Sequence, residues 1–537
     1  MPKQKKLALP SKKGKRSQVQ VPESADDYQE LADVEETTGN KWRAGDVRKA
    51  TNAYIRAIKL YIEGLQKFPQ SFDLAYNKSH LQLEMTQQPR IMAVLEEHHN
   101  ISPVHFLNTT LASHRYALHL EQDNAEVMFN TAQVLTSLAE ELSEFRSRRP
   151  TEAVRLLEEA PELFSSCLAR QEIMYEESQS MMQMAEEEEE DTAMDLSGGA
   201  PVPPSSDPNG NVAAENDISE DSNKPEEETA TIQQPTTAVD LIDTALAQLS
   251  TLATLCGVMS YLDEQKEPAL ISQLGRQLLE QRIPAYAAKL SPNELESVKS
   301  DIALSKAQFI GALTEAEFRH RDIDLQTSSE RLETFKQLDL TTDPKAMCAY
   351  ADALVEFSDA IGELYSSHQS PDIAARRWKF LSTASSLYTA ASKLEFATDK
   401  AAIHVARGDV ELLRHSLTEP PSNLSDALRA SAPTLLRNAE IYYRGAGRQA
   451  DADKDLRTAA EARIKESVAA HMAWLMGPGQ EEAPSTPRPA VFSGFSSPQA
   501  WCCIKEMESE GLLSETWAER IATEWRLSLG GMSNCGL

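Results

Sequence analysis

The sequence predicts an all-α fold, a solenoid of helical hairpins that a disordered acidic insertion interrupts. Three features lead to this prediction. Apolar residues recur at steps of three and four along most of the chain, which is the period of an amphipathic helix. Aromatic residues make up only 6% of the 537 residues, whereas Ala and Leu are abundant, and this favours helices packed through small side chains. A mid-chain stretch rich in Glu, Pro, Gly and Ser lacks the apolar residues that a core needs.

The helical period is clearest between Tyr116 and Glu141. Polar residues 122–124 separate two apolar runs, and Asn124 can cap the second run by accepting from free backbone N–H groups. Small Ala132 lies within that run, where a neighbouring helix can approach closely. One face of the run carries Met128, Phe129, Ala132, Leu135 and Leu138.

This stretch resembles the tetratricopeptide repeat, a 34-residue helix–turn–helix unit with small residues at fixed packing positions. The resemblance rests on Ala117 and Leu118 before the turn, on residues 124–126 and 128–130 after it, and on Ala132, where the family usually has Gly. Gly45-Asp46 followed by Ala50 and Ala57 repeats the pattern. The resemblance implies a protein-binding scaffold and no particular reaction. Its packing positions would be Gly45, Ala50, Ala57, Ala117 and Ala132.

Composition divides the chain into six segments. They are a disordered basic tail at 1–25, tetratricopeptide-like helices at 26–176, the disordered acidic insertion at 177–237, a second tetratricopeptide-like array at 238–476, a linker at 477–500 and a helical cap at 501–530.

Three local irregularities carry further expectations. Residues 90–115 break the period and are interpreted as a loop followed by a helix. Pro161 is expected to kink or split the helix that begins at Pro150. Gly408-Asp409 is interpreted as a loosely matched repeat turn. At the C-terminus Trp517, Ile521 and Trp525 stand four apart, which predicts a short helix that docks as a cap, with a partner-binding helix as the alternative.

The net charge of −30 is placed unevenly, because the first sixteen residues are basic. Two clusters separated by a short spacer look like a nuclear localisation signal. They are Lys3, Lys5, Lys6 and then Lys12, Lys13, Lys15, Arg16. We therefore expect a nuclear protein, with shuttling to the cytoplasm left open. The alternative is a generic basic tail that is disordered or contacts RNA.

The acidic insertion begins with Glu186, Glu187, Glu188, Glu189, Glu190 and Asp191. Between Glu186 and Glu228 stand fifteen acidic residues and one basic residue, Lys224. One interpretation is an acidic arm that shields a basic client, and the other is a solubilising linker. The acidity of the whole chain argues against nucleic acid as the main ligand, because phosphates would be repelled.

No motif of a phosphate loop, a dinucleotide fold, a nucleophile elbow or a zinc protease is present, so we expect no enzyme activity and no cofactor. His105, His114 and His119 do not share a helical face, and none of the six cysteines forms a CxxC pair, so no metal site is expected. The cysteines are interpreted as reduced thiols of an intracellular protein. We see no secretory signal and no apolar run near 18 residues, and therefore expect neither export nor a membrane span.

Tetratricopeptide domains that bind the C-terminal peptide of heat-shock chaperones hold its carboxylate with a clamp of Lys, Asn and Arg residues. Asn40, Asn77 and Asn130 fall near clamp-like asparagine positions. Glu36 and Glu126, however, stand four residues before Asn40 and Asn130, where negative charge would repel a carboxylate. We therefore expect Asn77 and Asn130 to line the inner groove as neutral donors and acceptors.

These features together predict a non-enzymatic nuclear chaperone or adaptor for a basic client, either a histone or a ribosomal protein. The layout resembles tetratricopeptide histone chaperones, which carry an acidic insertion within a repeat, and dedicated chaperones of ribosomal proteins. The alternative is a scaffold subunit of a nuclear transcription or RNA-processing assembly, in which the acidic arm is only a spacer.

Deletion of residues 1–17 should move a fluorescently tagged protein from the nucleus to the cytoplasm, because the deletion removes both basic clusters. Microscopy of cells that express the two forms measures the change. An unchanged distribution would show that these clusters do not direct import.

Overall fold

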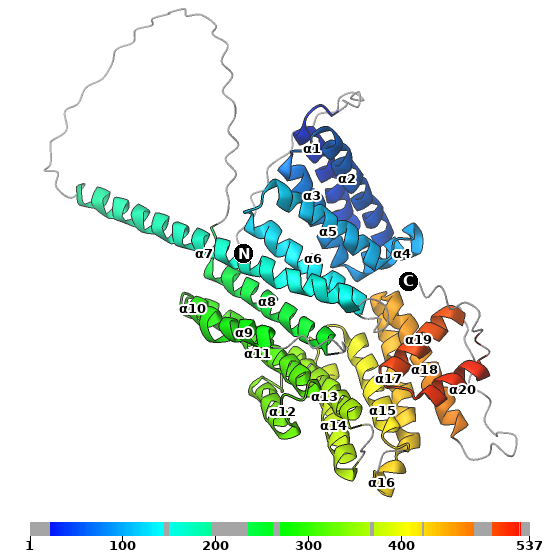
Figure 1. The fold of residues 1–537 in the computed structure, drawn as a ribbon. Coiled ribbons are helices and arrows are strands. Elements are labelled where there is room, and N and C mark those ends of the chain that lie inside the picture. The colour runs from blue at the N-terminus through cyan, green and yellow to red at the C-terminus, as the bar shows by residue number, and fades with distance from the viewer. Residues whose placement is uncertain are drawn as a thin grey trace, which may run out of the picture.

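The computed structural model describes residues 22–143, 150–195, 235–260, 269–365, 370–420, 424–476, 497–525 and residue 527. Every regular element in these ranges is helical, and none of the described residues forms a strand (Figure 1). The predicted all-α fold class is therefore confirmed.

The N-terminal part consists of successive antiparallel helices. Most pack on the helix that follows, but α5 packs on α3, and the shorter α4 lies beside α2 and α3. The bounds are α1 (Ala25–Trp42), α2 (Val47–Lys67), α3 (Phe72–Thr86), α4 (Pro89–His99), α5 (Pro103–Leu120), α6 (Ala125–Ser143) and α7 (Pro150–Asp195).

The second part continues in the same manner, with contacts that run from α8 through α11, α13, α14, α15 and α17 to α18. Each hairpin contacts mainly its neighbours, which makes the fold a repeat-like helical solenoid. The bounds are α8 (Ala238–Met259), α9 (Ala269–Gln277), the π-helix η1 (Leu278–Arg282), α10 (Ile283–Ala287), α11 (Pro292–Arg319), α12 (Leu325–Leu332), the 3-10 helix η2 (Glu333–Gln337), α13 (Pro344–Leu364), α14 (Pro371–Lys393), α15 (Lys400–Ser416), α16 (Asp426–Arg429), α17 (Ala432–Asp453), α18 (Leu456–Leu475), α19 (Ser497–Ser509) and α20 (Glu515–Glu524).

Helix α8 joins the two parts by packing directly on α7 (Figure 1). One hydrophobic core holds Leu157 and Phe164 of α7 together with Leu249 of α8 and Phe309 of α11. Gln248 Nε2 also donates to the carbonyl oxygen of Pro161 at 2.9 Å. The insertion between α7 and α8 therefore does not separate two independent cores.

Helix α7 corrects two expectations from the sequence. It continues through Pro161, which does not split it, and it extends to Asp195 rather than ending near residue 176. The residues after 176 are mainly Glu, Gln, Met and Ala, which are good helix formers, and the first Gly comes only at Gly198. Of the remainder of the predicted insertion, residues 196–234 lie outside the described residues, and residues 235–237 lead into α8, with Thr237 as its N-cap.

Two further expectations are wrong. The expected loop after Pro89 is helix α4, which has Pro89 in its first turn and ends at Asn100 in the left-handed region, with φ 54°. Gly408-Asp409 lies inside α15 and is not a turn. A Cβ at Gly408 would stand 2.3 Å from a ring carbon of Tyr443, so glycine is needed there for close packing against α17.

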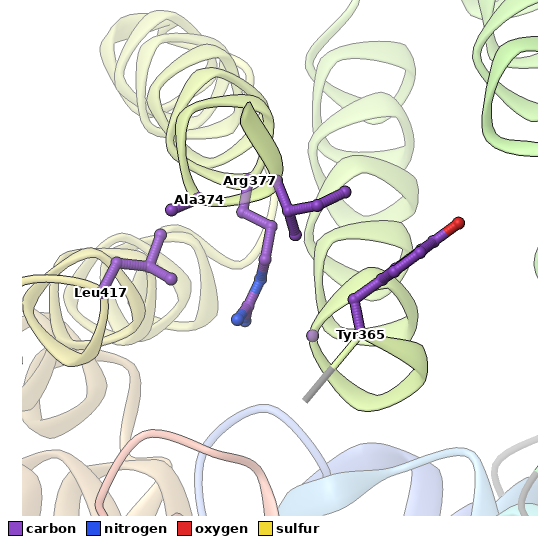
Figure 2. Close-up of a pocket in the computed structure, with 6 residues that line it drawn as sticks. Tyr365, Ala374, Arg377 and Leu417 are labelled. Atoms are coloured by element: carbon purple, nitrogen blue, oxygen red, sulfur yellow. The ribbon is translucent and has the colours of Figure 1, made fainter. Parts of the chain in front are cut away.

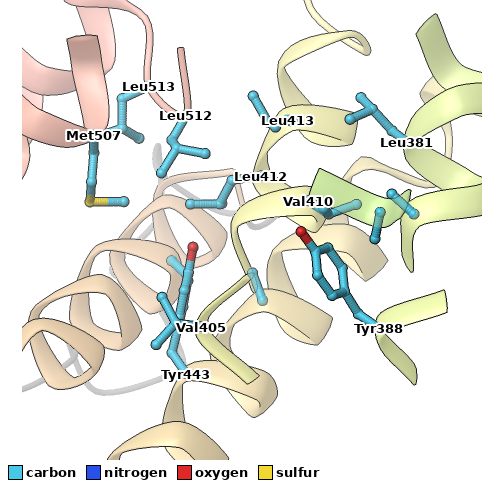
Figure 3. Packing of buried hydrophobic residues seen from close by; sticks show 14 of the residues in the cluster. Leu381, Tyr388, Val405, Val410, Leu412, Leu413, Tyr443, Met507, Leu512 and Leu513 are labelled. Carbon is cyan, nitrogen blue, oxygen red and sulfur yellow. The ribbon is translucent and has the colours of Figure 1, made fainter. Parts of the chain in front are cut away.

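Helices α19 and α20 form a C-terminal hairpin that packs on the array (Figure 3). Met507, Leu512 and Leu513 share one hydrophobic cluster with Leu412 and Leu413 of α15. The tryptophans Trp517 and Trp525 of this segment are buried in the same cluster. Trp517 Nε1 also donates to Glu419 Oε1 at 2.6 Å. The apolar edge of α20 is thus covered by the body of this chain.

Helix α8 is long and apolar enough to cross a membrane, by length and composition only. The expectation that no run near 18 residues is this apolar is therefore wrong. In the structure, 61% of its most apolar window is buried, and α8 packs between α7 and α11. A core helix of a helical protein has the same length and composition.

The packing of Gly408 predicts opposite effects for two Gly→Ala substitutions. Gly408→Ala should lower the free energy of unfolding by about 1–3 kcal/mol, because the new methyl group collides with Tyr443. Gly445→Ala in α17 meets nothing within 4 Å and should raise this free energy by about 0.5–1 kcal/mol, the helix-propensity difference. Urea unfolding measures both, and effects of the same sign would contradict the packing described.

Candidate protein-interaction surface

The structure places the predicted site residues in different surroundings. The basic residues Lys3 to Arg16 lie outside the described residues. The acidic run Glu186 to Asp191 falls within the helical span of α7, and its side chains are outside the description. The small residues Ala50, Ala57, Ala117 and Ala132 are all fully buried, and Gly45 lies in the turn between α1 and α2.

The asparagines compared with a carboxylate clamp differ in accessibility. Asn77 on α3 is half-buried, whereas Asn130 on α6 is buried. Asn40 Oδ1 accepts from the hydroxyl of Tyr54 at 2.9 Å, and Glu126 accepts from the hydroxyl of Tyr76. Asn40 and Glu126, two of the positions compared with the clamp, are therefore engaged by tyrosines of neighbouring helices.

A tyrosine hydroxyl on one helix donates to a carboxylate on another helix at five places along the array. These pairs are Tyr61 with Glu36, Tyr76 with Glu126, Tyr286 with Glu172, Tyr388 with Asp352, and Tyr443 with Asp409. Burial, and then the neighbouring carboxylate, raises the pKa of each tyrosine, so each stays a neutral donor. Sequence reasoning missed these pairs, because the partners stand between 25 and 114 residues apart.

Three carboxylates gather beside α13, and we name Glu315, Asp352 and Glu356 the α13 carboxylate cluster. Glu315 is buried and accepts from Arg319 Nε at 2.9 Å. Enclosure by the neighbouring helices raises the pKa of Glu356 well above its usual range, and the charges of Glu315 and Asp352 add to this effect. Asp352 and Glu356 have exposed residue surfaces, but Asp352 accepts from the hydroxyl of Tyr388 and Glu315 is paired with Arg319, so these carboxylates are bonded within the scaffold.

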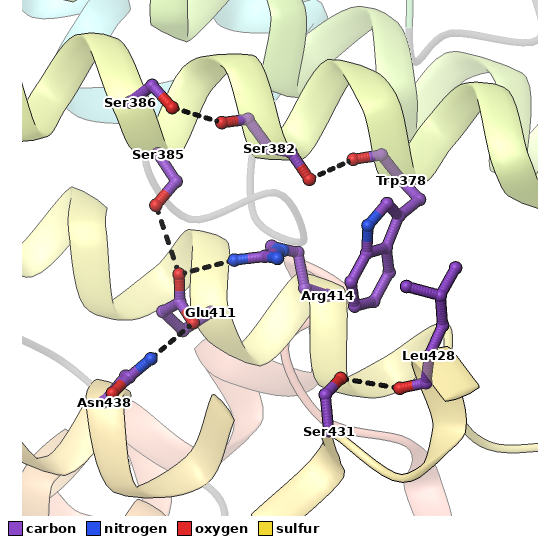
Figure 4. Close-up of polar contacts among 9 residues, drawn as sticks. All are labelled: Trp378, Ser382, Ser385, Ser386, Glu411, Arg414, Leu428, Ser431 and Asn438. Carbon is purple, nitrogen blue, oxygen red and sulfur yellow. Dashed lines mark hydrogen bonds and ion pairs between the residues drawn. The ribbon is translucent and has the colours of Figure 1, made fainter. Parts of the chain in front are cut away.

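Other charged groups of the C-terminal half are neutralised within the fold. Buried Glu411 accepts from Ser385, Arg414 and Asn438, and thereby ties α15 to α14 and α17 (Figure 4). The guanidinium of Arg414 stacks on Trp378. Buried Lys465 is 3.0 Å from Asp409 and 2.9 Å from Glu461. Since these groups have their partners inside the protein, we assign them to the scaffold.

Two concave sites differ strongly in size. A cavity beside α13 and α14 has a volume of about 10 Å³ and is lined by Arg377, Ala374, Tyr365 and Leu417 (Figure 2). It has room for one water molecule at most. An open groove between α2, α3 and α5 has a volume of about 330 Å³ and is large enough for a small ligand.

The second half of α7 leaves the body of the protein, and Figure 1 shows it projecting away from the array. Its last described anchors are Glu172, which accepts from Tyr286, and the ring of Tyr175, which lies 4.6 Å from Lys289 Nζ. Beyond them Met181, Met182 and Met184 are all exposed. Residues 176–195 carry nine acidic and no basic side chains in the sequence. The three methionine side chains are therefore open to contact by another molecule.

No group of three or more His, Cys, Asp or Glu residues that could hold a metal ion occurs among the described residues. His105 and His119 are exposed, whereas His114 is fully buried in α5. Neither ring nitrogen of His114 makes a well-formed hydrogen bond. Burial lowers the pKa of His114 to about 4, and the nearby His80 adds to the shift.

Comparison with known proteins shows likenesses but no family. No family model matches the chain. A UPF0656 protein of Schizosaccharomyces pombe is 23% identical over 473 residues, which cover 84% of this chain and 90% of that protein. Among solved structures, a circular tandem repeat protein with novel repeat topology and enhanced subunit contact surfaces matches at 11% identity with a TM-score of 0.26. That match covers 94% of this chain and 96% of the other.

The buried His114 predicts a specific loss of stability in acid. Its pKa is about 4 in the folded protein and about 6.5 in an unfolded chain, so the unfolded chain binds a proton first as the pH falls. The contribution of buried, neutral His114 to the free energy of unfolding is fully present above pH 6.5. About 2 kcal/mol of that free energy should be lost by pH 5. Urea unfolding at pH 7.5 and 5 should show a smaller pH effect in His114→Leu and an unchanged one in His105→Leu. Equal pH effects in His114→Leu and wild type would contradict this assignment.

Proposed function

We propose that this protein is a nuclear, tetratricopeptide-type chaperone or adaptor that binds a basic client protein, either a histone or a ribosomal protein. The observation that carries the proposal is the projecting half of α7, where nine acidic residues and no basic ones occupy a helix that the body does not cover. Such a helix presents a concentrated negative field to solvent.

The tetratricopeptide assignment is supported by the hairpin of α5 and α6. Asn124 Oδ1 accepts from the backbone N–H of Val127 at 3.1 Å and so caps α6. Ala117 and Ala132, at the small positions of the repeat pattern, have no solvent exposure. In α2, Asp46 caps the helix, and Ala50 and Ala57 are equally buried. These are the packing roles that the repeat requires of small residues.

A basic client is favoured by where the acidic charge is left unpaired. Lys465 and Arg414 neutralise the acidic groups around them, whereas residues 176–195 place nine acidic residues on the projecting half of α7. The projecting helix has no basic residue of its own between 176 and 195. Lys- and Arg-rich segments of a client would complement this helix, and anionic nucleic acid would not.

The alternative function is a scaffold subunit of a nuclear transcription or RNA-processing assembly. The solenoid itself favours it, because stacked helical hairpins offer long binding surfaces for several partners. In this case the acidic segment is a spacer, and its charge has no effect on binding.

A charge-neutralised variant separates these two functions. Replacing Glu186 to Glu190 by Gln and Asp191 by Asn should weaken binding to purified core histones or to a basic ribosomal protein, because long-range attraction is lost. The effect should fade as salt rises, since the Debye length is only about 8–10 Å near physiological salt. The variant should therefore show a shallower dependence of affinity on salt than the wild type.

A control variant removes the same number of acidic charges from exposed positions on the body. It carries Gln or Asn at Glu30, Glu63, Glu280, Glu296, Asp301 and Glu519. Its salt dependence should stay close to that of the wild type. Titrations at low and moderate salt, followed by fluorescence anisotropy, give the slopes. Equal affinities and equal slopes for all three proteins would leave the acidic segment as a spacer.

A further inference from the structure

The groove between α2, α3 and α5 combines apolar walls with a single charge. Ile62 and Leu65 of α2 face it together with Ala112 and Tyr116 of α5, and Lys78 of α3 is the one charged residue in its lining. Ile62 and Tyr116 are 39% and 36% exposed, so large apolar side chains here are open to solvent. Its volume of about 330 Å³ is at the lower end of the range for small-ligand sites.

Lys78 is unusual in a chain with 83 acidic residues, because its ammonium has no counterion among the described residues. The side chain is half-buried, and burial lowers its pKa. No carboxylate comes close enough to offset this effect. A partly desolvated ammonium without a partner costs free energy, and an incoming anion would recover it.

The groove is already shaped in the free protein. The Tyr116 hydroxyl donates to the carbonyl oxygen of Pro69, which fixes the ring as a wall. The hydroxyls of Thr109 and Ser113 donate to backbone carbonyl oxygens of their own helix, at 3.0 Å each. Among the lining residues, Lys78 and the amide of Gln66 therefore remain as free donors.

We propose that this groove binds a carboxylate attached to a short apolar segment of a partner protein. A single ammonium balances the single charge of a carboxylate, whereas a phosphate monoester carries a charge of about −1.5 to −2 at pH 7 and three acceptor oxygens. The apolar walls would cover one or two aliphatic or aromatic side chains next to the carboxylate. This site is independent of the acidic arm and would bind the opposite charge.

Three short peptides identify the ligand chemistry. Acetyl-Leu-Leu-Phe with a free C-terminus offers a terminal carboxylate, and its amide offers none. Acetyl-Leu-Glu-Phe amide offers a side-chain carboxylate instead. Titration into the full chain, followed by NMR of the lysine side chains, should show saturable binding of at least one acid and binding of the neutral amide about tenfold weaker. The acid that binds shows whether the groove recognises the carboxylate of a chain terminus or that of a Glu side chain.

Variants at Lys78 test its role. Lys78→Met should weaken binding of the acid about tenfold and should leave the melting temperature unchanged or higher, because an unpaired charge is removed. Lys78→Arg should retain most of the binding. Lys59→Met is the matched control, because Lys59 is an exposed lysine of α2 outside the groove, and it should bind like the wild type. Equal binding of acid and amide, no saturable binding of any peptide, or full binding by Lys78→Met would each overturn the proposal.

Discussion

The array depends on aromatic rings that pack against glycines of neighbouring helices. Tyr54 fills the space left at Gly39, and Tyr443 fills the space at Gly408, so that a Cβ at either glycine would stand 2.3 Å from a ring carbon. Phe309 does the same at Gly275, where the distance would be 2.0 Å. Such contacts let helix axes approach closely and bury a large ring at each crossing. Elsewhere alanine has the same role, as at the fully buried Ala132.

The tyrosine–carboxylate pairs fix the position of neighbouring helices along each other. A ring that fills a glycine gap could slide along its neighbour, but a hydroxyl that must reach one carboxylate sets the register. Tyr443 combines both functions, since its ring packs on Gly408 and its hydroxyl donates to Asp409 at 2.7 Å. The low polarity around these bonds strengthens them, and it makes loss of either partner costly. Apolar packing and polar bonds therefore specify the same arrangement of helices.

Much of the fold follows from local sequence patterns, and much of the candidate site does not. The helical period identified most helices, and Asn124 as a cap follows from its place before an apolar run. The extension of α7 beyond residue 176 does not follow from composition alone, because a run of acidic residues is typical of disorder although Glu is also a good helix former. Gly408-Asp409 resembles a repeat turn in sequence, but the need for glycine there comes from Tyr443, which lies 35 positions later in the chain. Lys78 gives no signal in the sequence, because its isolation depends on which carboxylates the fold places elsewhere.

The packing of α8 on α7 has a consequence for the integrity of the chain. The helices on either side of residues 196–234 share one core, to which Leu157 and Phe164 contribute from α7 and Leu249 from α8. Proteolytic cleavage of that segment would leave two fragments that share a hydrophobic interface and stay associated without a covalent link. The protein could in this way be divided into complementary halves at its most acidic point. The affinity of the two halves for each other would then measure how strongly the packing of α8 on α7 holds the two parts of the solenoid together.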